Sequence, residues 1–135
     1  MVRAMFSLEN YSFSKVIIDL SKKTSTELII SFDPSGEFNP KNSVYTLLFK
    51  FYASTEHNRT PFVSIDCQAT FSFDPQITFN DIPSYFYRNA IALLFPYLRA
   101  FVSTVTLQAN MPPIILPTMN LSGLENQLKE STTQL

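Results

Sequence analysis

The chain has 135 residues, 45% of them apolar and 16% charged, with a formal net charge of −1. This length suits one domain with its own core, and the balanced charge excludes the basic surface that binds nucleic acid or anionic lipid. A single cysteine excludes an intrachain disulfide and a cysteine-based zinc site. Because no apolar run is long enough for a signal peptide or a bilayer span, we expect a cytoplasmic protein without membrane insertion.

The first part of the chain, 1–78, is predicted to form strands and connecting loops. The segment Phe62–Phe73 alternates strictly between apolar and polar residues, which is typical of a half-buried antiparallel strand. One face of it carries the apolar residues Val63, Ile65, Cys67, Ala69, Phe71 and Phe73. The segment Val44–Ser54 is a second strand, and the polar stretch Thr55–Pro61 between the two predicts a hairpin.

Two shorter strands are predicted nearer the start of the chain. The stretch Phe6–Phe13 forms the first, and Glu27–Asp33 forms the second. The sequence Asp33-Pro34-Ser35-Gly36 is a turn signal and is predicted to end the second strand. The first half therefore predicts four antiparallel strands.

After Pro83 the apolar residues repeat at three and four positions, which predicts a long amphipathic helix within 81–108. Its opposite face carries residues that would let another helix or subunit approach: Asn89, Ala92, Arg99, Ser103 and Thr106. An apolar loop and a short helix follow within 109–130, where Ser122 and Glu125 form a capping box. A polar tail, 131–135, ends the chain. Strands followed by helices indicate an α+β fold, a four-stranded antiparallel sheet with two C-terminal helices on one face.

The residue inventory favours binding over catalysis. His57, the one histidine, lies in the most polar loop, and Cys67 lies on an apolar strand face, where a thiol behaves as a small hydrophobe. The carboxylates are dispersed, so neither a catalytic acid pair nor a metal site is indicated. Phosphate-binding glycine motifs are absent from the sequence. We therefore expect no enzymatic activity, no cofactor and no metal.

The second half resembles the SecB protein-export chaperones. The motif Leu94-Phe95-Pro96-Tyr97-Leu98-Arg99 carries the likeness, together with the apolar strip from Met111 to Leu124. The family shows the same order of helix motif, apolar strip, proline and entry to the last helix. Nearly the whole chain, 1–135, can be aligned with the family as one SecB-like domain without a large insertion.

This resemblance implies a homotetramer, a dimer of dimers, that holds unfolded polypeptide in apolar grooves without nucleotide and serves protein transport and translocation. The positions that match the family's peptide-binding groove are Leu28, Ile30, Phe32, Phe62, Met111, Ile114, Leu116, Met119, Leu121, Leu124 and Leu128. The alternative is that these residues form the core between the second helix and the sheet. For Phe32, Ile114 and Leu124 the two interpretations are even.

The chain departs from the export members at the residues that face the motor ATPase SecA. Asn10, Ser14 and either Ser64 or Ile65 occupy positions that are acidic in those members. The peptide-holding function does not depend on these positions, whereas docking to SecA does. The alternative function is therefore a SecB-like chaperone dedicated to one partner, such as the antitoxin of a toxin–antitoxin pair. A small-ligand-binding domain is a third hypothesis, for which the sequence offers no convergent polar groups.

Overall fold

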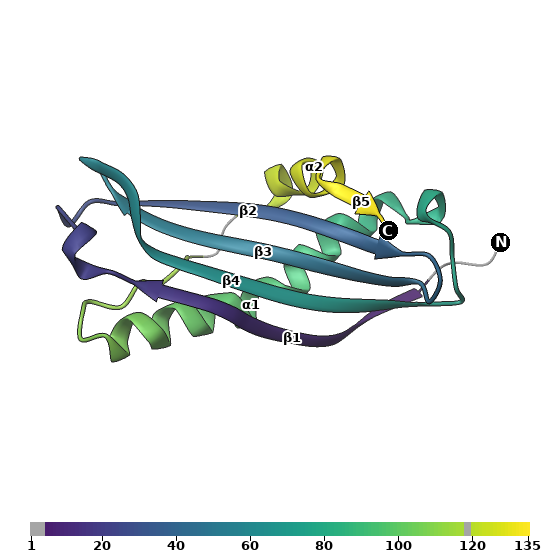
Figure 1. Cartoon of the computed structure of the whole chain (residues 1–135), viewed down its shortest axis with the longest axis horizontal. Helices are drawn as coiled ribbons and strands as arrows, with labels where there is room; N and C mark the ends of the chain where they lie inside the picture. Colours follow the sequence, from purple (N-terminus) through teal and green to yellow (C-terminus); the bar gives the residue numbers. More distant parts are fainter. Residues whose placement is uncertain (1–4, 118–119) are drawn as a thin grey trace.

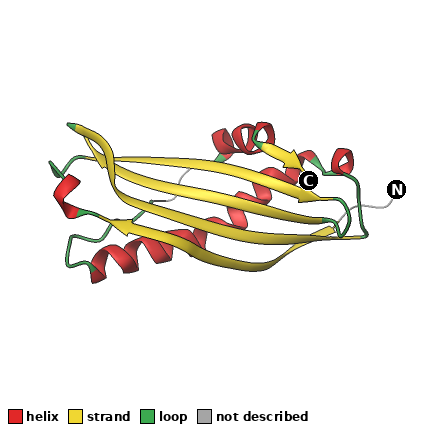
Figure 2. Ribbon diagram, viewed as in Figure 1, coloured by secondary structure: helices red, strands yellow, loops and turns green. Residues whose placement is uncertain are grey.

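The computed structural model describes residues 5–117 and 120–135. A mixed five-stranded sheet has the order β1-β4-β3-β2-β5, and one long helix, α1, crosses one of its faces (Figures 1 and 2). The strands are β1 (Met5–Ile18), β2 (Leu28–Asn39), β3 (Val44–Thr55), β4 (Asn58–Asp74) and β5 (Thr132–Gln134). The helices are α1 (Ser84–Gln108) and α2 (Ser122–Glu130), with two short 3-10 turns at Leu20–Lys22 and Phe79–Asp81.

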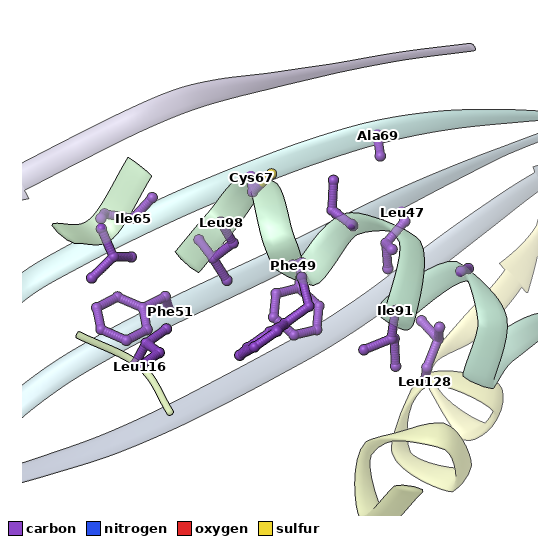
Figure 3. Close-up of a cluster of buried hydrophobic side chains, with 14 of the residues drawn as sticks. Leu47, Phe49, Phe51, Ile65, Cys67, Ala69, Ile91, Leu98, Leu116 and Leu128 are labelled. Carbon is purple, nitrogen blue, oxygen red and sulfur yellow. The ribbon is translucent and has the colours of Figure 1, made fainter. Parts of the chain in front are cut away.

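The predicted alternation in β4 is confirmed. Its apolar face is buried from Val63 to Phe73, and so is the matching face of β3 from Tyr45 to Ala53. These faces lie under α1, whose buried residues include Ile91, Leu94 and Leu98. Figure 3 shows the resulting core between sheet and helix. The predicted loop at Thr55–Pro61 shrinks to a tight turn, because β3 and β4 extend to within two residues of each other.

The turn predicted at Asp33–Gly36 is wrong, because β2 continues through it and pairs with β3 over its full length. The backbone N–H of Gly36 donates to the Ser131 carbonyl, 3.2 Å away on the outer side of β2. Backbone groups alternate between the two sides of a strand, so Pro34 also directs its nitrogen outward. The missing N–H therefore costs no bond to β3, and a proline is tolerated at this edge.

The polar tail predicted at 131–135 instead contains β5, which runs parallel to β2 beside Gly36–Phe38. The Tyr45 hydroxyl lies 2.6 Å from the Thr132 hydroxyl. The Tyr45 ring fills the space that a Cβ on Gly36 would need, so glycine is required there for close approach and not for a turn. The α+β class is thus confirmed, whereas the sheet is five-stranded and mixed rather than four-stranded and antiparallel.

The two helices are joined by side-chain contacts. Helix α2 lies beside the β2 edge of the sheet (Figure 1), and its Leu128 is buried beside Ile91 of α1 (Figure 3). The capping box predicted for Ser122 and Glu125 does not form. Asn120 accepts the Ser122 N–H through its side chain at 3.0 Å, while Glu125 pairs with Arg88 of α1 at 3.1 Å.

By length and composition alone α1 could cross a membrane, although 39% of its most apolar window is buried within the domain. The helix has no acidic residue and only two basic ones, Arg88 and Arg99. Its outward side is therefore unusually poor in charge for a helix at a protein surface.

Candidate functional site

The residues predicted to line a peptide groove lie mostly inside the protomer. Five of them are buried in the core, namely Phe62, Met111, Ile114, Leu116 and Leu128. Four are partly buried against it, namely Ile30, Phe32, Leu121 and Leu124. Leu28 is 38% exposed, and Met119 lies outside the described residues. Leu116 packs beside Phe51 (Figure 3), which is what the core interpretation expects of it. Their role in peptide binding stays a prediction.

An open groove lies next to these residues, between the outward side of α1 and the loop that follows it. Its volume is about 560 Å³. The residues that line it are Phe95, Pro96, Arg99, Ala100, Ser103, Thr104, Leu107, Pro113 and Ile115. We call this the α1 groove. It is mostly apolar, and Leu107 and Ile115 expose 57% and 68% of their surfaces.

Thr106 fixes the loop that forms the second wall of the α1 groove. Its buried hydroxyl accepts the backbone N–H of Ile114 at 2.9 Å and donates to the Val102 carbonyl at 2.7 Å. The loop is extended at this point, so successive side chains alternate in direction. Ile114 and Leu116 turn into the core, and Ile115 between them turns out into the groove. Thr106, which was expected on the open face of the helix, is therefore a buried anchor.

The α1 groove carries one formal charge, on Arg99. The two ion pairs found within residues 5–117 and 120–135 are Arg88 with Glu125 and Lys22 with Asp19. Arg99 forms no ion pair with a carboxylate of the described residues. Its guanidinium is exposed at the rim of a mostly apolar lining.

The outer edge of β2 is a second feature of this end of the molecule. The backbone N–H of Gly36 points away from β3, and every second residue of a strand shares that direction. Leu28, Ile30 and Phe32 therefore direct their backbone N–H and C=O groups away from β3. β5 covers β2 at Gly36–Phe38 and pairs with none of these three residues. Ile29, which alternates with them, is 49% exposed. An extended chain could add to this edge by main-chain hydrogen bonds.

No catalytic centre emerges from the titratable groups of the described chain. Burial raises the pKa of the Cys67 thiol to about 12, which keeps it protonated and unreactive at neutral pH. His57 is exposed in the turn between β3 and β4. Within residues 5–117 and 120–135, no group of three or more His, Cys, Asp or Glu side chains could hold a metal ion.

The positions compared with the SecA-facing acids lie on β1 and β4. Asn10 pairs with Thr70, and Ser14 is the extra residue of a bulge between Phe13 and Lys15. Of the two alternatives on β4, Ile65 is fully buried under α1. The side chain of Ser64 therefore points to the opposite face of the sheet.

On that same face four charged residues stand in register across the sheet. Asp33, Lys50, Asp66 and Lys15 come from β2, β3, β4 and β1 in turn. Their signs alternate, so this row presents no net negative charge.

Sequence reasoning missed most of the α1 groove. It named Arg99 and Ser103 as residues of an open helix face, which was a correct signal for an approachable surface. From the apolar strip after the helix it chose Met111, Ile114 and Leu116 for the peptide-binding groove and left out Ile115. Ile114, Ile115 and Leu116 are all apolar, so no signal in the sequence singles out Ile115 as the outward residue.

Comparisons with known proteins come from sequence and from structure. No family model matches the chain. A segment of 42 residues, 31% of this chain, is 50% identical to an uncharacterized protein of Methanocaldococcus jannaschii, MJ0357, and spans only 27% of that protein. A protein of unknown function from Streptococcus agalactiae overlaps 87% of this chain and all of its own at a TM-score of 0.47 and 9% identity, a likeness too slight to indicate a shared fold.

A closer likeness is to Rv1957 of Mycobacterium tuberculosis, a SecB-like chaperone solved in complex with a ChAD peptide from the Rv1956 HigA1 antitoxin. The structural match covers 84% of this chain and 90% of Rv1957, with a TM-score of 0.62 and 15% sequence identity. The resemblance deduced from the helix motif and the apolar strip is thereby confirmed at the level of the fold. The chain has a SecB-like fold.

Proposed function

We propose that this protein is a nucleotide-independent chaperone that holds an unfolded segment of one dedicated partner, such as the antitoxin of a toxin–antitoxin pair. The observation that carries the proposal is the charge-poor α1 groove, on a SecB-like fold whose β2 edge has no partner strand at Leu28, Ile30 and Phe32 among the described residues. The antitoxin peptide bound to Rv1957 favours a dedicated client over a general pool. The missing acids at Asn10, Ser14 and Ser64 argue against a role in export.

Binding would combine two kinds of contact. Each apolar client side chain that becomes buried would contribute about 1.5–3 kcal/mol before ordering costs. Strand addition at Leu28, Ile30 and Phe32 would supply main-chain hydrogen bonds that do not depend on client sequence. The predicted groove residues Leu121 and Leu124, partly buried next to this edge, would pack against the added segment.

We also propose that copies of the chain assemble, as a dimer of dimers in the cytoplasm. The outer edge of β1 has no partner strand in the described sheet. Exposed apolar residues accompany it, including a stacked pair, Tyr11 and Tyr97, whose ring centroids are 4.4 Å apart. Several grooves that engage one long client would raise its affinity by about 10²–10⁴ through effective concentration.

Light scattering on a size-exclusion column tests both parts of the proposal. We expect a particle near four times the chain mass that shifts when a reduced, denatured protein is added. A monomer that ignores the denatured protein and fails to suppress its aggregation would overturn the chaperone function.

Affinity capture from the native host then separates a dedicated chaperone from a general one. Recovery of one small protein, whose aggregation the purified chaperone prevents, supports the dedicated function. Recovery of many unrelated unfolded proteins would favour the general holdase instead.

A further inference from the structure

The sheet face opposite α1 carries a row of four charges across its middle. In Figure 1 α1 passes behind the strands, so this face is the one in view. The row runs Asp33, Lys50, Asp66 and Lys15 from β2 to β1, and neighbours in the row are register partners. The rows on either side of it are uncharged, and they consist of Ser35, Leu48, Gln68 and Ser12 on one side and Ser31, Tyr52, Ser64 and Ile17 on the other.

This charge row is complementary to a second copy of itself. Consider two sheets face to face, related by a two-fold axis that runs parallel to the strands between Lys50 and Asp66. The second row is then read in the reverse order, so Asp33 meets Lys15 of the second copy, and Lys50 meets its Asp66. A two-fold axis along the row would instead place every charge opposite its own like. The alternating signs therefore favour one isologous arrangement and disfavour the other.

The dimensions of the face suit this contact. Packed sheets lie about 10 Å apart, a gap that a lysine and an aspartate reaching toward each other can bridge. Four strands about 4.8 Å apart, over about 30 Å of β3 from Thr46 to Ser54, present roughly 600 Å² per copy. The total of roughly 1,200 Å² is at the lower limit of specific interfaces. With a net charge of −1, two copies repel each other little.

We infer that this sheet face binds a second copy of the chain through reciprocal Asp33–Lys15 and Lys50–Asp66 pairs. Asp33 also accepts a hydrogen bond from Gln127 at 3.4 Å through one carboxylate oxygen, which leaves the other for the lysine. The contact uses neither the β1 edge nor α1, so it joins particles that are already assembled through those surfaces. Each exposed ion pair contributes little, so the association is weak and reversible by salt. The inference does not rest on the chaperone function.

Sedimentation velocity over a range of protein concentrations tests it in sodium chloride at about 0.1 M and about 1 M, where the Debye length is about 10 Å and about 3 Å. We expect the mean mass at the lower salt to rise with protein concentration above that of the basal particle. At the higher salt the mass should return to that of the basal particle at every concentration.

A charge exchange between Lys15 and Asp33 separates contact between copies from contact within one. These residues lie three strand spacings apart, about 14 Å, so they form no pair within one sheet. Lys15→Asp places like charges together twice in each contact and should weaken the association at least about tenfold. Lys15→Asp combined with Asp33→Lys recreates both pairs and should restore it. Lys41→Asp, in the exposed turn between β2 and β3, is the matched control and should leave the association unchanged.

Three results would overturn the inference, once circular dichroism shows that each variant is folded. They are a wild type whose mass does not depend on salt, an association that survives Lys15→Asp, and a double variant that does not recover it. The last result would assign the row to lateral pairing between neighbouring strands of one sheet. The chaperone function is tested separately by the denatured-protein assay and stands or falls without these results.

Discussion

Two adjacent residues, Ile115 and Leu116, should respond in opposite ways to truncation. Leu116 is 1% exposed and packs beside Phe51, so Leu116→Ala opens a cavity and should lower the free energy of unfolding by about 2–5 kcal/mol. Ile115 is 68% exposed, so Ile115→Ala should change the free energy of unfolding by less than about 0.5 kcal/mol. Urea denaturation followed by circular dichroism measures both.

Client affinity should show the reverse pattern. A client that covers the exposed two-thirds of Ile115 would bury about two-thirds of the 1.5–3 kcal/mol of a full side chain, or about 1–2 kcal/mol. Loss of that burial corresponds to a dissociation constant raised about fivefold to thirtyfold. Leu116→Ala, assayed well below its melting temperature, should bind within about twofold of the wild type. The reasoning is refuted if Ile115→Ala binds the client as tightly as the wild type, or if Leu116→Ala weakens binding without loss of stability.

The remaining predictions concern the fold around the site. Gly36→Ala forces a methyl group into the Tyr45 ring and should lower the free energy of unfolding by about 1–3 kcal/mol. Gly123→Ala is the control, because a Cβ there meets open space, and it should not lower the free energy of unfolding. Equal stability of the two variants in urea would contradict the Tyr45 contact. Thr106→Val leaves the buried Ile114 N–H without an acceptor and should cost about 1–3 kcal/mol, whereas Ser103→Ala on the same helix should cost about 0.5 kcal/mol or less in the same assay. The pKa of Cys67 is raised to about 12 in the fold against about 8.5 in an unfolded chain, so its contribution to stability is complete below about pH 8.5 and is lost as the pH rises toward 12. Wild type should therefore lose more stability than Cys67→Ala between pH 8 and pH 10, and its thiol should react with a disulfide reagent at pH 8 only after unfolding; prompt reaction of the native protein would contradict this.

The sequence predicted the elements whose pattern is local. Strict alternation identifies β4, and the three-and-four repeat identifies α1, because in each case one face must meet the core. The strand β5 has no such signal, since Thr132–Gln134 is polar and is held by the long-range contact between Tyr45 and Thr132. Pro34 was interpreted as a turn residue. That its nitrogen points away from β3, so that no hydrogen bond to β3 is lost, depends on the register of β2 with β3.

The site was predictable only in part for the same reason. The apolar strip after α1 is visible in the sequence, but which of its residues face out depends on where Thr106 fixes the loop. Arg99 was visible as a residue of the open helix face, but the pairing of Glu125 with the other arginine of α1, Arg88, could be found only in the structure. Both facts join residues that are distant along the chain.

Pro34 also limits what a bound segment can become. A strand that adds to the outer edge of β2 can bond to Leu28, Ile30 and Phe32, and then meets a residue that offers no N–H. β5 occupies the edge beyond it, at Gly36–Phe38. A captured segment would therefore form only a short ladder on this edge, and a contact of so few hydrogen bonds could be released without a motor.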